Sequence, residues 1–149
     1  AFNISLGNPA ITKEQIINAA KQVFIHDFIQ TLPNGYETVL DKGDQSLSAG
    51  QAQLISFARA LVNPAPIMLL DEATANVDSL AERELQKGLT TLLKQKTAIV
   101  VAHRLSTIKQ ADIILALNDG KIIEYGTHDA LLKNKGFYAN LYHMQFTSI

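Results

Sequence analysis

The sequence predicts an α/β fold in which helices flank a parallel sheet. Two observations lead to this fold class. Helical and strand-like segments alternate along the chain, and residues 67–70 and 98–102 form short, continuous apolar runs. The alternating order implies crossover connections between parallel strands. Because a continuous apolar run is typical of a strand covered on both faces, we expect both strands to be buried.

Composition is that of a globular domain. Of the 149 residues, 47% are hydrophobic and 18% are charged. The net charge of -1 gives no electrostatic reason to expect nucleic acid or an anionic membrane as a partner. Cysteine is absent, which excludes disulfides and thiolate metal sites. No apolar run approaches the ~20 residues of a transmembrane helix. Because the chain starts within an apolar segment, we expect it to be part of a longer protein.

Capping pairs and turn residues mark the predicted helices. Thr12 and Gln15 have capping-box spacing, and apolar residues at helical intervals predict one helix that continues through Phe28 to the turn residues at 32–35. Residues 36–47 are rich in Gly and charge and should be irregular. The remaining expected elements are a helix from Ser48 to Asn63, a helix from Ser79, strands at 113–117 and 121–125 around an Asn-Asp-Gly turn, and helices at about 129–133 and 137–144.

Polar side chains follow the two predicted strands, where a parallel sheet binds its ligands. Asp71 and Glu72 follow the run 67–70, and His103 follows the run 98–102. One carboxylate can hold Mg²⁺ through water, while the other orients or deprotonates an attacking water. The histidine can contact a phosphate oxygen. The alternatives are a solvated acidic strand end and a surface histidine that caps a neighbouring element, and the residues alone leave them open.

The segment Leu47-Ser48-Ala49-Gly50-Gln51 opens the second predicted helix. Exposed backbone N–H groups and the positive end of the helix dipole make such a terminus an anion site. Ser48 adds a hydroxyl, and Gly50 allows a phosphate to approach the backbone closely. The alternative is a plain N-cap, since Ser48 and Gln51 also have capping-box spacing.

Together these segments resemble the motifs of the ATP-binding cassette (ABC) ATPase family. Their order and short gaps also match, so the resemblance covers nearly the whole chain. The matched segments are 47–51 with the signature motif, 66–72 with the Walker B strand and catalytic glutamate, 74–78 with the D-loop, 101–107 with the switch-histidine segment, and 120–128 with the closing hairpin.

The resemblance implies ATP and Mg²⁺ as ligands of the complete protein, which would be an ATPase. Glu72 would be the general base, His103 would contact the γ-phosphate, and Asp71 would support Mg²⁺ through water. These roles are carried over from the family motif onto the matching residues.

The resemblance also implies a second cassette as a head-to-tail partner. Ser48, Gly50 and Gln51 would form a surface that closes over ATP held by that cassette, and Asp78 would couple the two sites at the same interface. Ala49 departs from the family motif, because it replaces the first glycine of the signature.

Residues 32–36 and 38–43 resemble two sequence stretches found in ABC exporters. In those exporters, the stretch that corresponds to residues 38–43 contacts the coupling helices of the transmembrane domain. Leu40 and Asp41 depart from that pattern, where a glycine and a glutamate are common. The resemblance therefore implies a domain at the cytoplasmic face of a membrane that belongs to an integral membrane transporter and hydrolyses ATP to drive export.

No GxxxxGK[ST] loop occurs in the sequence. The resemblance therefore implies that the chain starts just after the glutamine loop. We expect an incomplete P-loop NTPase-like (RecA-like) domain, with residues 1–63 as the helical signature subdomain and residues 64–149 as the C-terminal part of the ATPase core. Without the P-loop, the isolated chain is expected to be inactive.

Two other functions remain open at this stage. One is a part of a non-transport ABC ATPase of the DNA-repair, chromosome-structure or translation type, although the near-neutral charge argues against a nucleic-acid partner. The other is an interaction module that carries the signature without enzymatic activity. Sequence that precedes this chain in the complete protein would separate them.

Overall fold

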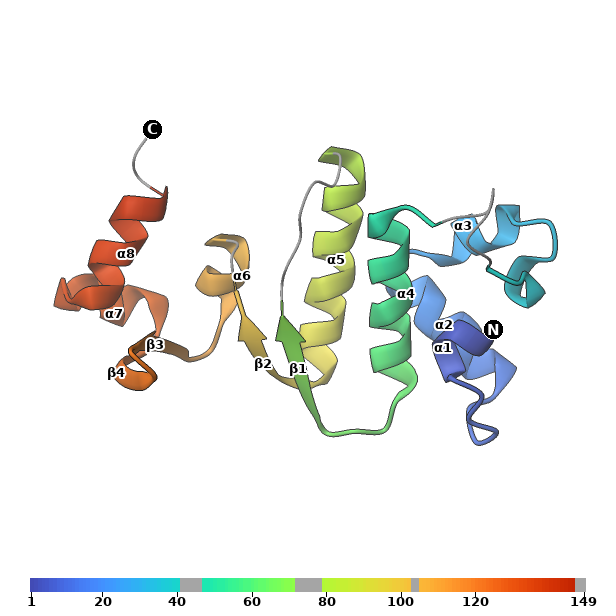
Figure 1. The fold of residues 1–149 in the computed structure, drawn as a ribbon, viewed down its shortest axis with the longest axis horizontal. Helices are drawn as coiled ribbons and strands as arrows, with labels where there is room; N and C mark the ends of the chain where they lie inside the picture. The colour runs from blue at the N-terminus through green and yellow to red at the C-terminus, as the bar shows by residue number, and fades with distance from the viewer. Residues whose placement is uncertain (41–46, 72–78, 103–104, 147–149) are drawn as a thin grey trace. The chain divides into compact units, whose positions relative to one another are not determined.

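The computed structural model describes residues 1–40, 47–71, 79–102 and 105–146 (Figure 1). It contains two compact units, one of residues 1–70 and 74–99 and the other of residues 71–73 and 100–149. Each unit is described by itself. The expected subdomain boundary after residue 63 stays a prediction. Within the described ranges, no helix combines the length and the apolar character needed to cross a membrane.

The first unit is mainly helical, and its centre is α4. This helix packs against α1, α2 and α5. Both capping boxes that the sequence predicts in this unit, at Thr12 and at Ser48, are present. The helices of the unit are α1 (Phe2–Ser5), α2 (Lys13–Gln22), α3 (His26–Thr31), the 3-10 turn η1 (Gly35–Glu37), α4 (Ala49–Val62) and α5 (Ser79–Gln95).

The prediction of one continuous helix from Thr12 through Phe28 was wrong, because the chain breaks between α2 and α3. Phe24 has a φ of 65°, and Phe24 N and Ile25 N donate hydrogen bonds to Lys21 O and Ala20 O. This is the Schellman pattern of a helix end. A bulky residue in the left-handed region costs roughly 1–2 kcal/mol. Burial of the neighbouring Val23 and Ile25, at 0% and 1% exposure, offsets that cost.

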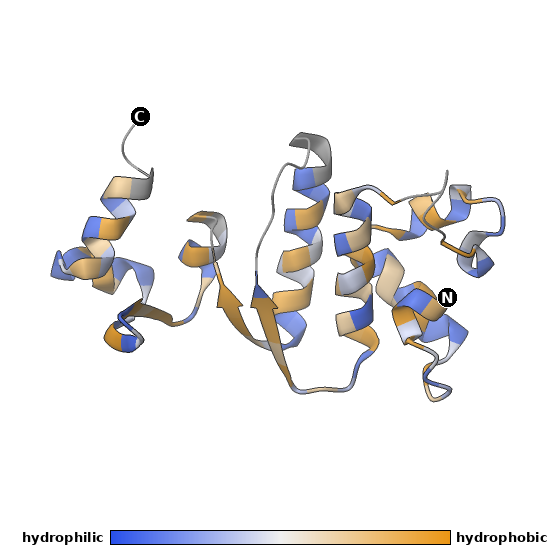
Figure 2. Cartoon of the chain, viewed as in Figure 1, coloured by the Kyte–Doolittle hydropathy of each residue, from blue (hydrophilic) through white to orange (hydrophobic). Residues whose placement is uncertain are grey.

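Strands β1 (Ile67–Asp71) and β2 (Thr97–Val101) form a two-stranded sheet and point the same way in Figure 1. Met68 and Leu70 pack against the helical core. Both strands consist mainly of hydrophobic residues (Figure 2), and those on the opposite face are exposed, with Leu69 at 76%. The expectation that both faces are covered was therefore wrong for the described residues. Strand side chains alternate between faces, and the helices of this unit cover one of them.

The second unit consists of a β-hairpin packed against two helices. Its strands are antiparallel, and the turn between them has positive φ at Asp119 (49°) and Gly120 (73°), as the Asn-Asp-Gly sequence predicts. Leu131 and Tyr138 lie in its buried core. The elements of the unit are α6 (Leu105–Gln110), β3 (Ile114–Asn118), β4 (Lys121–Gly126), α7 (His128–Asn134) and α8 (Phe137–Phe146).

A carboxylate on β4 caps the N-terminus of α8. Phe137 N donates to Glu124 Oε1 at 3.1 Å, and Tyr138 N donates to Glu124 Oε2 at 2.8 Å. A Cβ atom at Gly136 would lie 1.7 Å from Glu124 Oε1. Glycine at position 136 is therefore what allows the carboxylate to reach both N–H groups of the helix end.

We expect Gly136→Ala to lower the free energy of unfolding by about 1–2 kcal/mol, because the new methyl group displaces Glu124 and leaves two helix N–H groups uncapped. In a Glu124→Ala background the same change should cost much less, since the cap is already lost. Urea unfolding and amide hydrogen exchange at Phe137 and Tyr138 measure both effects. Equal costs in the two backgrounds would show that another contact at Gly136 matters.

Candidate functional site

The N-terminus of α4 brings together the predicted signature residues Ser48, Gly50 and Gln51. Ser48 is the N-cap. Its Oγ accepts a hydrogen bond from Gln51 N at 3.2 Å, and Ser48 N donates to Gln51 Oε1 at 3.0 Å. The structural role of this pair as a capping box is thus confirmed. Because Ser48 Oγ accepts in this pair, its hydroxyl hydrogen is left to donate elsewhere.

The exposed part of this helix end is small. Ser48 and Ala49 are exposed, Gln51 is half-buried, and Gly50 is buried. Ala49 is not among the residues with positive φ, so its methyl group replaces the glycine of the family motif without backbone strain. The surface that an anion can reach therefore consists of the Ser48 hydroxyl and the backbone around Ala49.

The electrostatics of this terminus favour an external anion. The first turn of α4 contains no acidic residue, whereas the first turns of α2 and α5 contain Glu14 and Glu82. A carboxylate at a helix N-terminus partly neutralises the positive end of the helix dipole. In α4 that end is not neutralised from within its own first turn, so it remains attractive to a phosphate.

Close packing holds α4 in place behind this site. Leu54 and Phe57 are buried on the face of α4 that contacts α5. A Cβ atom at Gly88 of α5 would lie 3.1 Å from Leu54 Cδ2 and 3.4 Å from Phe57 Cδ2. The two helices approach this closely because position 88 has no side chain. On another side, Arg59 Nε donates to Asn3 O at 3.0 Å and links α4 to α1.

Asp71, the predicted metal-supporting carboxylate, is the last residue of β1 and is exposed, and its role stays a prediction. The strand that carries it is anchored from behind by Met68 and Leu70. The connection from α4 to β1 is held by Lys96, whose Nζ donates to Asn63 O and, at 3.1 Å, to Ala65 O. An exposed carboxylate on an anchored strand end is chemically suited to a hydrated Mg²⁺ ion.

Three predicted site residues, Glu72, Asp78 and His103, lie outside the described residues, and their roles stay predictions. Of the predicted contact segment 38–43, the structure describes residues 38–40. The described ranges contain no group of three or more His, Cys, Asp or Glu side chains that could hold a metal ion by themselves. Asp71 would accordingly hold Mg²⁺ together with water or phosphate oxygens rather than within a protein cage.

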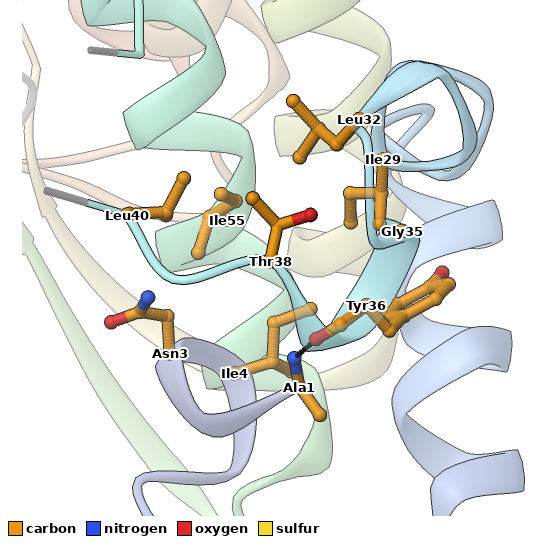
Figure 3. A pocket seen from close by; sticks show the side chains of 10 residues that line it. All are labelled: Ala1, Asn3, Ile4, Ile29, Leu32, Gly35, Tyr36, Thr38, Leu40 and Ile55. Atoms are coloured by element: carbon orange, nitrogen blue, oxygen red, sulfur yellow. Dashed lines mark hydrogen bonds between the residues drawn. The ribbon is translucent and has the colours of Figure 1, made fainter. Parts of the chain in front are cut away.

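Sequence reasoning missed a pocket in the first unit (Figure 3). Thr38 and Leu40 line it together with apolar side chains of α1, α3 and α4. Next to it, His26 Nδ1 lies 2.9 Å from the hydroxyl oxygen of Tyr36. The resemblance of residues 32–36 to an exporter sequence stretch pointed to this region. No local sequence pattern, however, predicts that the Tyr36 hydroxyl pairs with His26.

Known proteins resemble this chain in sequence and in structure. A sequence model of the family described as ABC transporter matches residues 4–75. An ATP-dependent lipid A-core flippase of Saccharophagus degradans is 49% identical over 147 residues, which cover 99% of this chain and 25% of the relative. A protein of the same description from Desulfotalea psychrophila is 50% identical over 143 residues, with 96% and 25% covered.

Among solved structures, a bacterial Atm1-family ABC exporter with ATP bound matches with a TM-score of 0.81 and 38% identity. The match covers 97% of this chain and 25% of that chain. This chain thus spans about a quarter of the length of these relatives. With a family match, relatives near half identity and an exporter of the same fold, this chain belongs to the ATP-binding cassette (ABC) transporter family and is similar to part of an exporter-type ATP-binding domain.

Proposed function

We propose that this chain supplies the signature surface and the hydrolytic residues of an ATPase domain that powers export across a membrane. The observation that carries the proposal is the N-terminus of α4, where an exposed Ser48 caps a helix whose first turn has no acidic residue. In a member of the ABC family, a helix N-terminus at the signature motif that can bind an anion is suited to the γ-phosphate of ATP.

The phosphate at this terminus would belong to ATP held by a second cassette. Ser48 would donate its hydroxyl to a γ-phosphate oxygen, and the backbone N–H groups of the first turn would add further donors. Gln51 would act through Ser48, because its side chain accepts the Ser48 N–H. Asp78 would lie at the same interface and couple the two sites. Because these groups act on nucleotide held by the partner, hydrolysis would require a head-to-tail pair.

The hydrolytic groups would stand at the ends of β1 and β2. Mg²⁺, when bound, neutralises negative charge that develops on the phosphates. Asp71 would hold that ion through water, and Glu72 would take the proton of the attacking water. His103 would donate to a γ-phosphate oxygen and so stabilise the transition state.

The membrane domain would contact the first unit near residues 38–43. In the described part of this segment, Thr38 and Leu40 line the pocket, while Val39 is 81% exposed. An exposed apolar residue on an anchored segment is suited to contact with a short helix of the membrane domain. The complete protein would place this domain at the cytoplasmic face of the membrane. Its membrane segments would select the transported molecule.

In the complete protein, we expect Glu72→Gln to lower ATP turnover by ~10²–10⁴-fold while ATP binding is retained, because the amide keeps the shape of the carboxylate but cannot accept the proton. Glu84→Gln, at an exposed position of α5, is the matched control and should leave turnover unchanged. Steady-state ATPase assays and nucleotide-binding titrations measure the two effects. Turnover within about threefold of the unmodified protein would assign the base to another group.

A negative charge at the α4 terminus should block ATP-driven pairing of two cassettes. Gly50→Asp adds both charge and bulk, but Gly50 is buried, so that variant also disturbs packing. Ala49→Asp is the cleaner test, because position 49 is exposed and an aspartate in the first turn stabilises the helix. Ala49→Asn has the same size without the charge and should pair with ATP. Sizing chromatography of the complete cassette with ATP decides, and tight pairing of Ala49→Asp would contradict the proposal.

The 149 residues alone should show no measurable ATPase activity and at best very weak ATP binding. The sequence contains no GxxxxGK[ST] loop, whose amides and lysine supply most phosphate-binding energy in such enzymes. Asp71 and Glu72 should repel the nucleotide when those groups are missing. Isothermal titration with Mg·ATP measures the affinity. A dissociation constant in the low micromolar range would mean that these residues form a complete site.

A further inference from the structure

A histidine–tyrosine pair joins α3 to the 3-10 turn η1, and Gly35 and Tyr36 of that turn line the pocket. His26 is the first residue of α3, and Tyr36 lies at the centre of η1. His26 Nδ1 is 2.9 Å from the Tyr36 hydroxyl oxygen. Burial raises the pKa of the Tyr36 phenol above its usual value, and the charge of Asp27 raises it further. The phenol therefore keeps its proton at neutral pH and can donate a hydrogen bond to an unprotonated Nδ1.

Hydrogen bonds within the turn link residues 32–38 into one network. Gly35 N donates to Leu32 O at 2.9 Å, and Thr38 N donates to Gly35 O at 3.2 Å. Asn34 N donates to Thr38 Oγ1 at 3.2 Å. A displacement of Tyr36 would therefore be passed on to Thr38 at the start of the segment that follows.

Residues 38–40 continue from this turn along the pocket. Tyr36, Thr38 and Leu40 all line the pocket, and in Figure 3 the ring of Tyr36 extends away from Leu40. The ring is 7% exposed and belongs to the core, while Val39 is 81% exposed. The side chain of Tyr36 thus anchors the segment from behind, and Val39 is the residue that the segment offers to a partner.

We propose that the hydrogen bond between His26 and Tyr36 is a positioning contact that fixes how residues 38–40 are presented to the membrane domain. This inference rests on the proposed contact near residues 38–43. Tyr36 would act through the backbone that it anchors, and neither residue of the pair would touch nucleotide. Loss of the hydrogen bond should leave the ring packed but allow Val39 to move out of the contact.

The test uses the complete transporter without other cysteines, carrying Val39→Cys and treated with a membrane-impermeant maleimide; this chain itself has no cysteine. The labelling rate is compared with that of the same protein unfolded in urea. We expect slow labelling of Val39→Cys and a rate roughly three- to tenfold faster after Tyr36→Phe, the range that corresponds to loss of one net hydrogen bond.

The second unit offers a matched control. His128 Nδ1 lies 2.7 Å from the Tyr138 hydroxyl oxygen, so Tyr138→Phe removes a hydrogen bond of the same kind from a pair that does not line the pocket. It should leave the labelling rate unchanged. At the other end of the pair, His26→Asn keeps an acceptor near the position of Nδ1 and should preserve slow labelling, whereas His26→Leu should act like Tyr36→Phe.

The outcomes separate the two proposals. If Val39→Cys alone reacts as fast as in urea, the membrane domain does not shield this segment, and the proposed contact is wrong. If labelling is slow but Tyr36→Phe does not change it, the contact stands and the positioning role is overturned. An equal acceleration by Tyr138→Phe would also overturn it, because the effect would then be a general loosening of the fold.

Discussion

The packing of α4 against α2 and α5 is the contact on which the rest of the first unit depends. The close approach at Gly88 lets Leu54 and Phe57 pack into the core. Interiors of this kind are packed too densely to shift without loss of contacts. Because α4 carries Ser48 at one end and leads into β1 at the other, this one packing arrangement sets the direction of the anion-facing terminus and the start of the strand that ends at Asp71.

The two ends of α4 are stabilised by polar contacts that differ in how far apart their partners lie in the sequence. At the N-terminus, the capping box uses only Ser48 and Gln51. At the C-terminus, Lys96, which lies between α5 and β2, donates hydrogen bonds to the backbone of the α4–β1 connection. Removal of either contact would leave helix-end or loop groups without these partners. The proposed site therefore depends on two supporting contacts, one made by Ser48 itself and one made by Lys96 at the far end of the helix.

The exposed face of the β1–β2 sheet is consistent with the short span of this chain relative to its relatives. Leu69 of β1 and Ile99 of β2 are 76% and 58% exposed, whereas Met68 and Leu70 on the other side of β1 pack against the helical core. An apolar face of this kind normally packs against a further layer of structure. If the proposed function is right, Ser48 and the hydrolytic residues of this chain act on ATP, and other parts of the transporter make the main contacts with its phosphates.

The sequence alone determined the features that depend on neighbouring residues. The capping boxes at Thr12 and Ser48 and the Asn-Asp-Gly turn of the hairpin formed as predicted, because each is built from hydrogen bonds or dihedral preferences within a few residues. The family was also predictable, since its motifs are short and ordered. The roles of all the predicted site residues stay predictions, and three of these residues, Glu72, Asp78 and His103, lie outside the described residues.

Tertiary structure decided what depends on residues far apart in the chain. The break at Phe24 follows from burial of the residues on either side of it, which offsets the strained backbone of a bulky residue. The cap of α8 needs Glu124 from a different element and a glycine at position 136, and the His26–Tyr36 contact joins two short helices. Periodicity and propensity report on local backbone preference, whereas these contacts exist only once the elements pack, because packing alone brings their side chains within hydrogen-bonding distance.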